Sequence, residues 1–305
     1  PLRCRVPLWT LSHGRSLDLS VPRLMAIVNV TPDSFSDGGR YPTVAEAVAA
    51  CAAFVAAGAH MLDIGGESTR PGAARVAPVE QVERVVPVIE ALRRDPRFDA
   101  IPISVDTTMA SVARAALLAG ADAVNDVSGL ADDGPAMLDL LGASDCGYIL
   151  MHRLRPPEAD SYSDRYADAP RYHDVVAEVK AALVAGLERL DLHGVARERV
   201  VLDPGLGFGK TVEQNLELIR RTDELRRIGL PVLSGLSRKS FVGRWSLGRD
   251  SQPSERLQGT LELSAEHVRC GATLLRVHDV AAHAELLTAL LAKRTPRASV
   301  GSDGR

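Results

Sequence analysis

The chain has 305 residues, 46% hydrophobic but only 4% aromatic, which is enough for one large domain or two ordinary ones with an aliphatic core. Its 36 basic and 39 acidic residues give a formal net charge of −3, so the sequence offers no support for a nucleic-acid partner. We find no apolar run near the roughly 18 residues of a membrane-spanning helix and no secretory signal, and we expect no membrane partner. The four cysteines are far apart and lack metal-ligand spacing, which predicts reduced thiols and a cytoplasmic location.

Short apolar runs alternate with longer amphipathic stretches from about Leu24 to Leu291. The apolar runs predict eight strands: Met25–Val30, Met61–Gly65, Ile101–Val105, Ala123–Val127, Gly147–Met151, Val200–Asp203, Pro231–Gly235 and Thr273–Val277. The alanine-rich segments between them predict helices: Val44–Ala57, Val79–Arg93, Ser111–Ala119, Val175–Leu192, Val212–Arg226, Glu255–Cys270 and Ala281–Lys293. Eight such repeats favour a single (β/α)8 TIM barrel, with an open doubly wound sheet as the competing architecture.

The chain contains no linker that would divide it into domains. We interpret residues 1–21 as an extended lead-in with room for a short hairpin, residues 22–294 as the barrel, and residues 295–305 as a disordered polar tail. The segment Arg153–Arg171 is rich in Pro, Asp, Arg and Tyr. It is predicted to be a long loop after the fifth strand, either a lid or a solvated excursion.

Functional residues of such barrels gather at the carboxyl ends of the strands, and the polar residues of this sequence follow that rule. The most informative stretch follows the first strand and reads Asn29-Val-Thr-Pro-Asp-Ser-Phe-Ser-Asp-Gly-Gly39. A strand end there delivers an amide side chain and then opens into a loop with two acids, an aromatic ring and a glycine pair. This combination suits a loop that binds a metal-associated anion and closes over it.

Three hydrogen-bonding residues, Asp106, Asn125 and Asp203, lie at further strand ends. Carboxylates accept paired N–H donors and an asparagine can both donate and accept, so these residues suit the edge of a flat, amide-rich heterocycle. The alternative is that they only cap the helices that follow.

A second group of residues is cationic and suits an anion: Arg70, Lys239, Arg276 and His278, with Asn29 opposite them. Arginine binds phosphate oxygens through a bidentate fork and lysine binds them as a point charge. The alternative is a set of solvated surface charges, with His278 as a structural histidine.

The run from Gly205 to Thr211 superficially looks like a phosphate-binding P-loop. The P-loop spacing would require a glycine at position 204, where this sequence has Pro204. A nucleoside triphosphatase is therefore not predicted, and the glycines are better explained by close approach of the backbone and Phe208 to a flat ligand.

Together these motifs resemble the dihydropteroate synthases, a family of pterin-binding TIM barrels. The resemblance extends from about Leu24 to Leu291. The matching segments are Asn29–Gly39, Gly66-Glu-Ser-Thr-Arg-Pro-Gly72, Ser104-Val-Asp106, Asn125-Asp-Val-Ser-Gly129, Asp203-Pro-Gly-Leu-Gly-Phe-Gly-Lys210, Ser237-Arg-Lys-Ser-Phe241 and Arg276-Val-His-Asp279.

The resemblance implies a reaction in which 4-aminobenzoate is joined to 6-hydroxymethyl-7,8-dihydropterin diphosphate, giving dihydropteroate and diphosphate. It implies an SN1-like course in which diphosphate leaves before the aniline nitrogen attacks. It also implies a Mg²⁺ cofactor and a homodimer built on the last helices. The pterin pocket implied by the resemblance comprises Asp106, Asn125, Asp203 and Lys239, with Met151, Phe208 and Gly235 shaping it.

The resemblance also assigns residues to the diphosphate. Arg276 would stack on the pterin and reach the diphosphate, while His278 and Asn29 meet the diphosphate and Asn29 helps to hold the metal. Thr69 and Arg70 would belong to a second mobile loop. We further predict that Asp37 stabilises the pterin cation and that Phe35 and Pro71 form the aminobenzoate slot. The residues predicted to be catalytic are Asp37, Lys239 and Arg276.

Three alternatives stay open at this point. A methyltetrahydrofolate-dependent methyltransferase would keep the pterin pocket, but it would need neither a diphosphate cradle nor the acids of the first loop. A catalytically inactive paralogue would bind pterin or a partner without turnover. A sulfonamide-insensitive synthase could arise from small changes in the first two loops.

Overall fold

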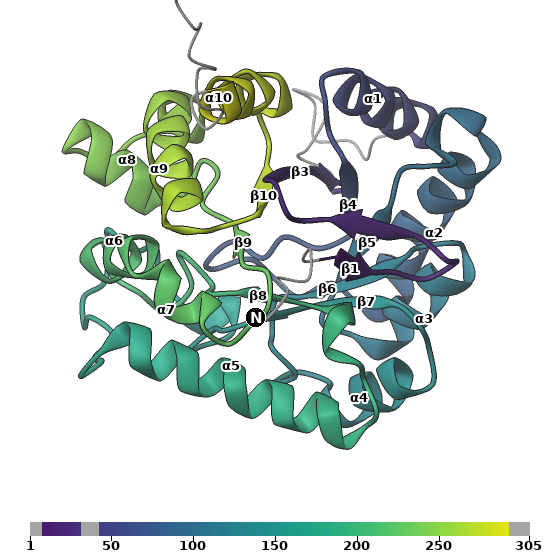
Figure 1. Ribbon diagram of the computed structural model, residues 1–305, viewed down its shortest axis with the longest axis horizontal. Coiled ribbons are helices and arrows are strands. Elements are labelled where there is room, and N and C mark those ends of the chain that lie inside the picture. Colours follow the sequence, from purple (N-terminus) through teal and green to yellow (C-terminus); the bar gives the residue numbers. More distant parts are fainter. Residues whose placement is uncertain (1–7, 32–42, 293–305) are drawn as a thin grey trace, which may run out of the picture.

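The computed structural model describes residues 8–31 and 43–292, and it contains a barrel of eight parallel strands (Figure 1). The strands run in the order β8-β7-β6-β5-β4-β3-β10-β9. Their ends differ from the predicted ends by at most two residues. They are β3 (Arg23–Asn29), β4 (Met61–Gly65), β5 (Ile103–Asp106), β6 (Ala123–Asp126), β7 (Gly147–Met151), β8 (Val200–Asp203), β9 (Leu233–Ser234) and β10 (Leu274–Val277).

The first and last strands of this order are joined to each other. A parallel bridge pairs Leu202 of β8 with Val232, immediately before β9, and the Leu202 amide donates to the Pro231 carbonyl. Because β9 also pairs with β10 and β10 with β3, the ring of strands has no free edge. The prediction of a (β/α)8 barrel is confirmed, and the open doubly wound sheet is excluded.

Helices surround the strands in chain order, and most of them were predicted (Figure 1). Two were not, α4 and α8, because each is short and carries glycine. The predicted Val212–Arg226 helix is broken at Arg221 into α6 and α7. The helices are α1 (Val44–Ala56), α2 (Pro78–Arg94), α3 (Ala110–Leu118), α4 (Gly134–Gly142), α5 (Val175–Leu192), α6 (Val212–Arg220), α7 (Thr222–Arg226), α8 (Ser240–Leu247), α9 (Leu257–Cys270) and α10 (Val280–Ala292).

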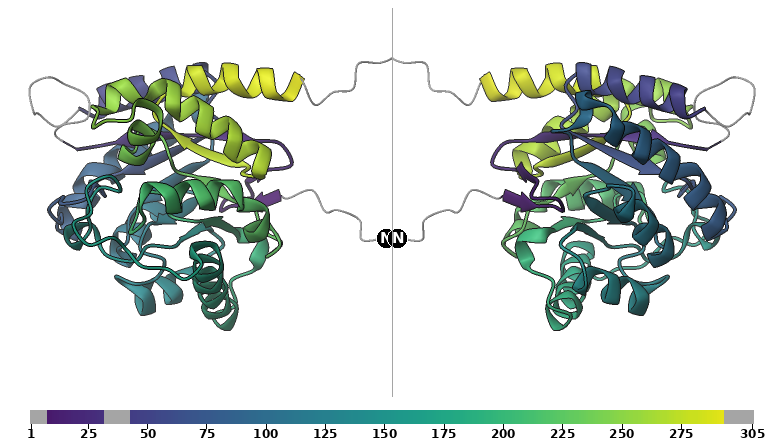
Figure 2. Two further views of the ribbon diagram at one scale, coloured as in Figure 1. Left: turned by 90° about the vertical axis from the view of Figure 1, so that its left-hand side faces the viewer. Right: turned by 90° about the vertical axis from the view of Figure 1, so that its right-hand side faces the viewer.

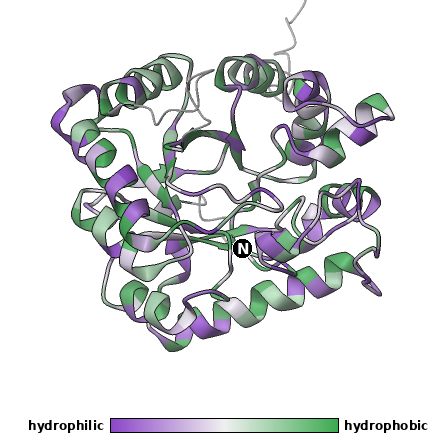
Figure 3. Ribbon diagram, turned by 180° about the vertical axis from the view of Figure 1, so that it is seen from behind, coloured by the Kyte–Doolittle hydropathy of each residue, from purple (hydrophilic) through white to green (hydrophobic). Residues whose placement is uncertain are grey.

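The main hydrophobic core lies between the barrel and its helices. Hydrophobic and hydrophilic residues alternate around the helices, as expected when one face packs on a sheet and the other meets solvent (Figure 3). The core is built from aliphatic residues contributed by strands and helices all around the ring. Phe98, Tyr148 and Phe241 are among its few large aromatic side chains, in keeping with the low aromatic content.

A hairpin closes the amino-terminal end of the barrel. Strands β1 (Leu8–Thr10) and β2 (Ser16–Asp18) pair antiparallel, at the place where the sequence allowed a short hairpin (Figure 2). Trp9 is fully buried, and its Nε1 donates to the Arg199 carbonyl at 2.8 Å. The hairpin side chains form one apolar cluster with inward-facing barrel residues: Trp9, Leu11, Leu17, Leu19, Met25, Met61, Ala123, Ile149, Val201, Leu233 and Leu274. A site inside this barrel must therefore open at the carboxyl end.

A buried histidine links α9 to the barrel. His267 is fully buried, and its Nδ1 lies 2.8 Å from the Ser234 hydroxyl at the end of β9. Its Nε2 has no hydrogen-bond partner. Burial lowers the pKa of His267 to about 3. The folded protein therefore holds this imidazole neutral in a pH range where an unfolded chain protonates it.

We expect the protein to lose stability as the pH falls from about 6.5 toward 3, partly because of His267. The unfolded chain binds a proton at this position below about pH 6.5 and the folded chain does not, so the contribution is complete above that pH. From pH 6.5 to 5.0 one such group accounts for roughly 2 kcal/mol. In urea unfolding at both pH values, His267→Gln should lose less stability on acidification than the wild type. Equal losses would contradict this account.

Candidate active site

The strand register brings the predicted site residues to the carboxyl end of the barrel. Asn29 pairs with Gly65, Gly65 with Asp106, and Asp106 with Asn125, so four adjacent strands contribute one row of residues. Residues paired in this way lie on the same face of a sheet, here the inner one. The other strands add, at the same end of the barrel, Met151, Asp203, Gly235, Arg276 and His278.

Two of the predicted hydrogen-bonding side chains are buried and incompletely paired. Asp106 is 5% exposed and Asn125 is 1% exposed. The Oδ1 atom of each is buried without a hydrogen-bond partner. Buried acceptors of this kind are costly unless a donor reaches them, so both call for N–H groups from a ligand. Neither side chain caps a helix. Only Asp203 has a local bond, from the Gly205 amide to its Oδ1 at 2.7 Å.

Arg276 joins this group to the carboxylate of Asp63, which was not among the predicted site residues. The Arg276 Nε donates to Asp63 at 2.6 Å, and its Nη2 donates to Asp106. Burial raises the pKa of Asp106 to about 7; Arg276 opposes this rise and Asp63 adds to it. Two buried carboxylates thus share one guanidinium. The sequence signal for Asp63 was a lone acid in the apolar run from Met61 to Gly65.

Lys239 lies across the opening from these acids. Its ammonium donates to the Leu206 carbonyl and sits 4.2 Å from the centre of the Phe208 ring. Burial lowers the pKa of Lys239 to about 8, and Asp203 opposes that shift. The loop after β8 therefore positions both the cation and an aromatic face, as the sequence predicted.

A second buried lysine, Lys210, holds that loop in shape and was not predicted. Its Nζ donates to the Gly205 and Phe208 carbonyls at 3.0 and 2.9 Å and lies 3.0 Å from His152 Nδ1. Burial lowers the pKa of Lys210 to about 7, with Asp203 opposing. The sequence signal was the rarity of lysine, since the whole chain has only four.

An apolar wall stands beside the acceptors. Val127, Met151 and Phe208 are buried and form a small cluster of their own. Gly235 lies close to Asp203, since a Cβ atom there would be in ordinary contact with Asp203 Oδ2 at 3.6 Å. The barrel end therefore combines a hydrophobic face with a row of acceptors, which is the combination that a flat, amide-rich ring requires. All of these residues except Val127 were predicted site residues.

His278 is poised as a neutral N–H donor. Its Nδ1 lies 3.0 Å from the Ser237 hydroxyl oxygen, which accepts from the His278 backbone N–H at 3.2 Å. If the hydroxyl hydrogen points to Nδ1, the imidazole carries its proton on Nε2. Burial lowers the pKa of His278 to about 3, with Arg276 and Arg238 adding to the effect.

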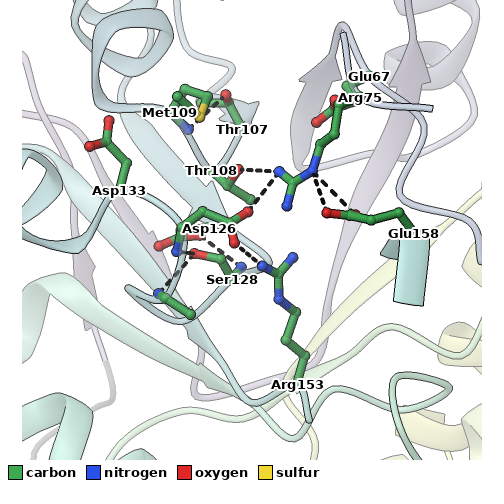
Figure 4. Close-up of polar contacts among 12 residues, drawn as sticks. Glu67, Arg75, Thr107, Thr108, Met109, Asp126, Ser128, Asp133, Arg153 and Glu158 are labelled. Carbon is green, nitrogen blue, oxygen red and sulfur yellow. Dashed lines mark hydrogen bonds and ion pairs between the residues drawn. The ribbon is translucent and has the colours of Figure 1, made fainter. Parts of the chain in front are cut away.

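The second loop carries Thr69 and Pro71, both half-buried, and Arg70, which is exposed. Its far end is anchored by Arg75, whose Nη1 donates to Asp132 at 2.8 Å and whose Nε donates to Glu158 at 3.2 Å (Figure 4). Asp132 also pairs with the buried Arg153.

A groove of about 690 Å³ lies beside this anchor and contains none of the predicted site residues. It is lined by Glu67, Arg75, Val76, Ala77, Pro78, Gln81, Met109, Ala131, Asp132, Pro156 and Glu158.

We expect Arg75→Met to loosen the second loop. Glu158 would lose this cation and Asp132 would keep its pair with Arg153, and the exposure of Arg75 limits the effect to roughly a 2- to 10-fold faster amide exchange. Hydrogen-exchange mass spectrometry on peptides covering residues 66–77 measures this. Arg97→Met breaks a comparable exposed pair with Asp95 away from the barrel end and serves as the control. If both variants leave the second-loop peptides unchanged, Arg75 is not an anchor.

The segment after β7 packs on the barrel end. The Gly209 amide donates to Asp160 at 2.8 Å, the Tyr172 hydroxyl donates to the Gly209 carbonyl at 3.0 Å, and the Gly72 amide donates to the Pro157 carbonyl at 3.0 Å. Asp160 itself is buried. The interpretation of Arg153–Arg171 as a solvated excursion is therefore wrong for its buried parts, which join the loop after β8 to the second loop.

Asn29 is half-buried at the end of β3, and a Cβ atom on Gly65 would lie 3.8 Å from its Oδ1 and 3.7 Å from Asp106 Oδ2. Among residues 8–31 and 43–292, no group of three or more His, Cys, Asp or Glu side chains could hold a metal ion. An amide oxygen beside a carboxylate suits Mg²⁺ only with further oxygens from a ligand, as is usual for this ion. Asn29 fits that role. The predictions for Phe35 and Asp37 lie outside the described residues.

A closed barrel with all these polar groups at its carboxyl end defines a TIM-barrel enzyme. The family model for pterin binding enzymes matches residues 25–278. The dihydropteroate synthase of Synechocystis sp. is 44% identical over 86% of this chain and 87% of its own, and that of Escherichia coli (strain K12) is 42% identical over 88% and 90%.

Solved structures agree with these sequence matches. The Xanthomonas albilineans dihydropteroate synthase with 4-aminobenzoic acid is 43% identical, with a TM-score of 0.84 over 96% of this chain and 100% of that one. The same enzyme in complex with 7,8-dihydropteroate is 42% identical, with a TM-score of 0.80 over 93% of this chain and 98% of that one. The chain therefore belongs to the dihydropteroate synthases, transferases within the pterin-binding enzymes. In the described part of the chain no helix is long and apolar enough to span a membrane.

Proposed function

We propose that this enzyme joins 4-aminobenzoate to 6-hydroxymethyl-7,8-dihydropterin diphosphate, releasing diphosphate and forming 7,8-dihydropteroate for folate biosynthesis. The observation that carries the proposal is the pair of buried, unpartnered oxygens, Asp106 Oδ1 and Asn125 Oδ1, at the same end of the barrel as the Asp203 carboxylate. The 2-amino group and ring N–H of a pterin are donors that match such acceptors. The relatives bound to 4-aminobenzoic acid and to 7,8-dihydropteroate support the same substrate and product.

The pterin ring lies, in this proposal, against Met151 and Phe208 with its donor edge toward the three acceptors. Lys239 donates to an acceptor on the ring and Arg276 stacks on the ring. The Asp63 and Asp106 bonds already hold the Arg276 guanidinium inside the barrel, so no reorganisation is needed when the ring arrives. Gly235 supplies the space beside Asp203.

The diphosphate faces the positive side of the site. Arg276 and His278 donate to it, and the neutral imidazole of His278 offers Nε2–H as the donor. Arg70, on the exposed second loop, adds positive charge at the mouth of the site. Asn29 would hold Mg²⁺ together with diphosphate oxygens; when bound, the metal would neutralise charge on the leaving group. These donors stabilise the departing diphosphate and make an SN1-like course favourable.

The aminobenzoate nitrogen attacks after the diphosphate has begun to leave. Thr69 and Pro71 on the second loop, with Phe35 on the first, would form its slot, and Asp37 would stabilise the pterin cation before the aniline nitrogen attacks. Water must be excluded while that cation exists, so both loops should close before departure.

Asp37→Asn is expected to lower kcat by about 100-fold or more while weakening pterin binding by less than about threefold, because the cation exists only after the diphosphate bond breaks. Steady-state kinetics and calorimetric binding of the pterin diphosphate separate the two effects. Comparable losses in turnover and in binding would remove the proposed cation role.

A coupled diphosphate-release assay tests the whole proposal. Release should require both the pterin diphosphate and 4-aminobenzoate, and product should be detected as dihydropteroate. No aminobenzoate-dependent product would reject the synthase function and favour a catalytically inactive paralogue. Methyl transfer from methyltetrahydrofolate would favour the methyltransferase. Adding a sulfonamide to the same assay distinguishes a sensitive synthase from an insensitive one.

We also propose a cytoplasmic homodimer formed through α9 and α10. A groove of about 440 Å³ runs between these helices, lined by Gln258, Leu261, Glu262, Ala265, Arg269, Ala282, Glu285 and Leu286. Leu257, at the start of α9, is 37% exposed. Light scattering should give twice the monomer mass, and Leu261→Glu should give the monomer. A wild-type monomer at micromolar concentration would contradict the dimer.

A further inference from the structure

We propose that Asp63 is a positioning residue that sets the hydrogen-bond polarity of the pterin site by holding the Asn125 amide with its oxygen toward the ligand. The proposal rests on the proposed function, because it takes the pterin to be the ligand. Asp63 lies two residues before Gly65 on β4, one inward-facing layer below the row of site residues. From there it acts on the ligand through its neighbours.

Three donors from three other strands converge on this carboxylate. Its Oδ1 accepts from the Ser104 hydroxyl on β5 at 2.6 Å. Its Oδ2 accepts from Asn125 Nδ2 on β6 at 3.0 Å and from Arg276 Nε on β10 at 2.6 Å. Asp63 is only 1% exposed. A buried carboxylate with three donors is firmly held, and it holds those donors in turn.

The bond to Asn125 decides which end of that amide faces the ligand. A carboxylate can only accept, so the NH2 end of Asn125 must face Asp63 and the carbonyl end must face away. The carbonyl Oδ1 is the atom that is buried without a partner. A flipped amide would set two oxygens against each other and lose the bond. Asp63 therefore makes Asn125 an acceptor for ligands.

The bond to Arg276 fixes the guanidinium in the same way. Asp63 holds Nε while Asp106 holds Nη2, so the plane of the group is set by two carboxylates on adjacent strands. The remaining carboxylate oxygen of Asp106 also has no partner. The two free side-chain oxygens, Asp106 Oδ1 and Asn125 Oδ1, therefore offer only hydrogen-bond acceptors to the ligand edge that meets them. The site selects a heterocycle whose edge carries N–H donors, such as the 2-amino-4-oxo edge of a pterin, and rejects one whose edge carries acceptors.

An exchange of the two side chains tests this role. Asn125→Asp sets two carboxylates against each other and should weaken calorimetric binding of the bare 6-hydroxymethyl-dihydropterin by about tenfold or more. Adding Asp63→Asn restores a donor between the two positions and leaves an outward-facing oxygen at position 125. Arg276 Nε, which shares Asp63 Oδ2 with Asn125, loses that acceptor, while the guanidinium keeps its bond to Asp106. The double variant should bind the bare pterin at least about threefold more tightly than Asn125→Asp, without reaching wild-type affinity. A double variant that binds no better than Asn125→Asp would overturn the proposal, because general damage cannot be repaired by a second change.

A second variant covers the case in which Asn125→Asp does not fold. Asp63→Leu removes the acceptor for Asn125 and for Arg276 Nε, so bare pterin affinity should fall about tenfold or more, whereas affinity for inorganic diphosphate, which meets Arg276 but not Asn125, should fall less because Asp106 still holds the guanidinium. Equal losses for both ligands would overturn the role of Asp63. Ser104→Ala, which removes the donor remote from Asn125, is the control. Wild-type protein that does not bind the bare pterin would instead reject the proposed function.

Discussion

Arg276→Met should abolish dihydropteroate formation and destabilise the fold by about 3–5 kcal/mol, the usual cost of removing one partner from a buried ion pair. Asp63 and Asp106 are 1% and 5% exposed and share this one guanidinium. Without it, two carboxylates on neighbouring strands repel each other inside the barrel. They can relieve that repulsion only by taking up a proton, so the variant should lose more stability than the wild type as the pH rises from about 5 to 8, because Arg276 no longer opposes the rise in the Asp106 pKa.

Two further variants separate charge from geometry at position 276. Arg276→Lys keeps the charge, but a lysine cannot bond to both carboxylates and stack on a ring, so pterin diphosphate binding should weaken while the fold is largely kept. Asp106→Asn in the Arg276→Met background removes one of the two competing charges and should restore part of the stability without activity. Urea unfolding at pH 5 and pH 8, together with calorimetry, measures these effects. Unchanged pterin diphosphate affinity in Arg276→Lys would count against the stacking role.

Gly205→Ala should remove the pterin site and destabilise the protein by more than about 4 kcal/mol. Gly205 has φ of +68°, and a Cβ atom there would lie 1.7 Å from the His152 carbonyl oxygen. The atoms that this Cβ would overlap are the backbone carbonyl oxygen and carbon of His152, so no side-chain rotation can relieve the overlap. The loop after β8 would have to move, together with Asp203, whose Oδ1 accepts from the Gly205 amide, and Lys210, whose Nζ donates to the Gly205 carbonyl.

Gly194→Ala is the matched control for that prediction. Gly194 has a similar φ of +73°, but nothing lies within 4 Å of its added Cβ atom. Only the conformational strain remains, which costs about 1–2 kcal/mol. Thermal unfolding and pterin calorimetry on both variants compare a steric overlap with simple strain. Similar losses in the two variants would show that the contact with His152 does not matter.

The barrel itself could be predicted from the sequence because its signals are local. Each strand is a short apolar run and each long helix has its own periodicity, so the eight repeats were visible without any contacts. Helices α4 and α8 were missed because tertiary packing, not local propensity, keeps such short glycine-containing segments helical. The sequence only favoured a closed barrel over an open sheet. Closure depends on a bridge between Leu202 and Val232, which are 30 residues apart, and no local pattern shows such a bridge.

Site residues that belong to motifs at strand ends could be predicted from the sequence. Hydrogen-bond partners that come from distant strands could not. The sequence by itself determined that Asn29, Asp106, Asn125, Asp203, Lys239, Arg276 and His278 gather at one end, since carboxyl ends of parallel strands must meet there. Only the tertiary structure decided which of them are paired. Asp63 is 213 residues from Arg276 in the chain, and Lys210 is 58 residues from His152. Hydrogen bonds across such separations depend on strand register and barrel closure. The hydrogen bonds that form then decide which side-chain atoms stay free for a ligand.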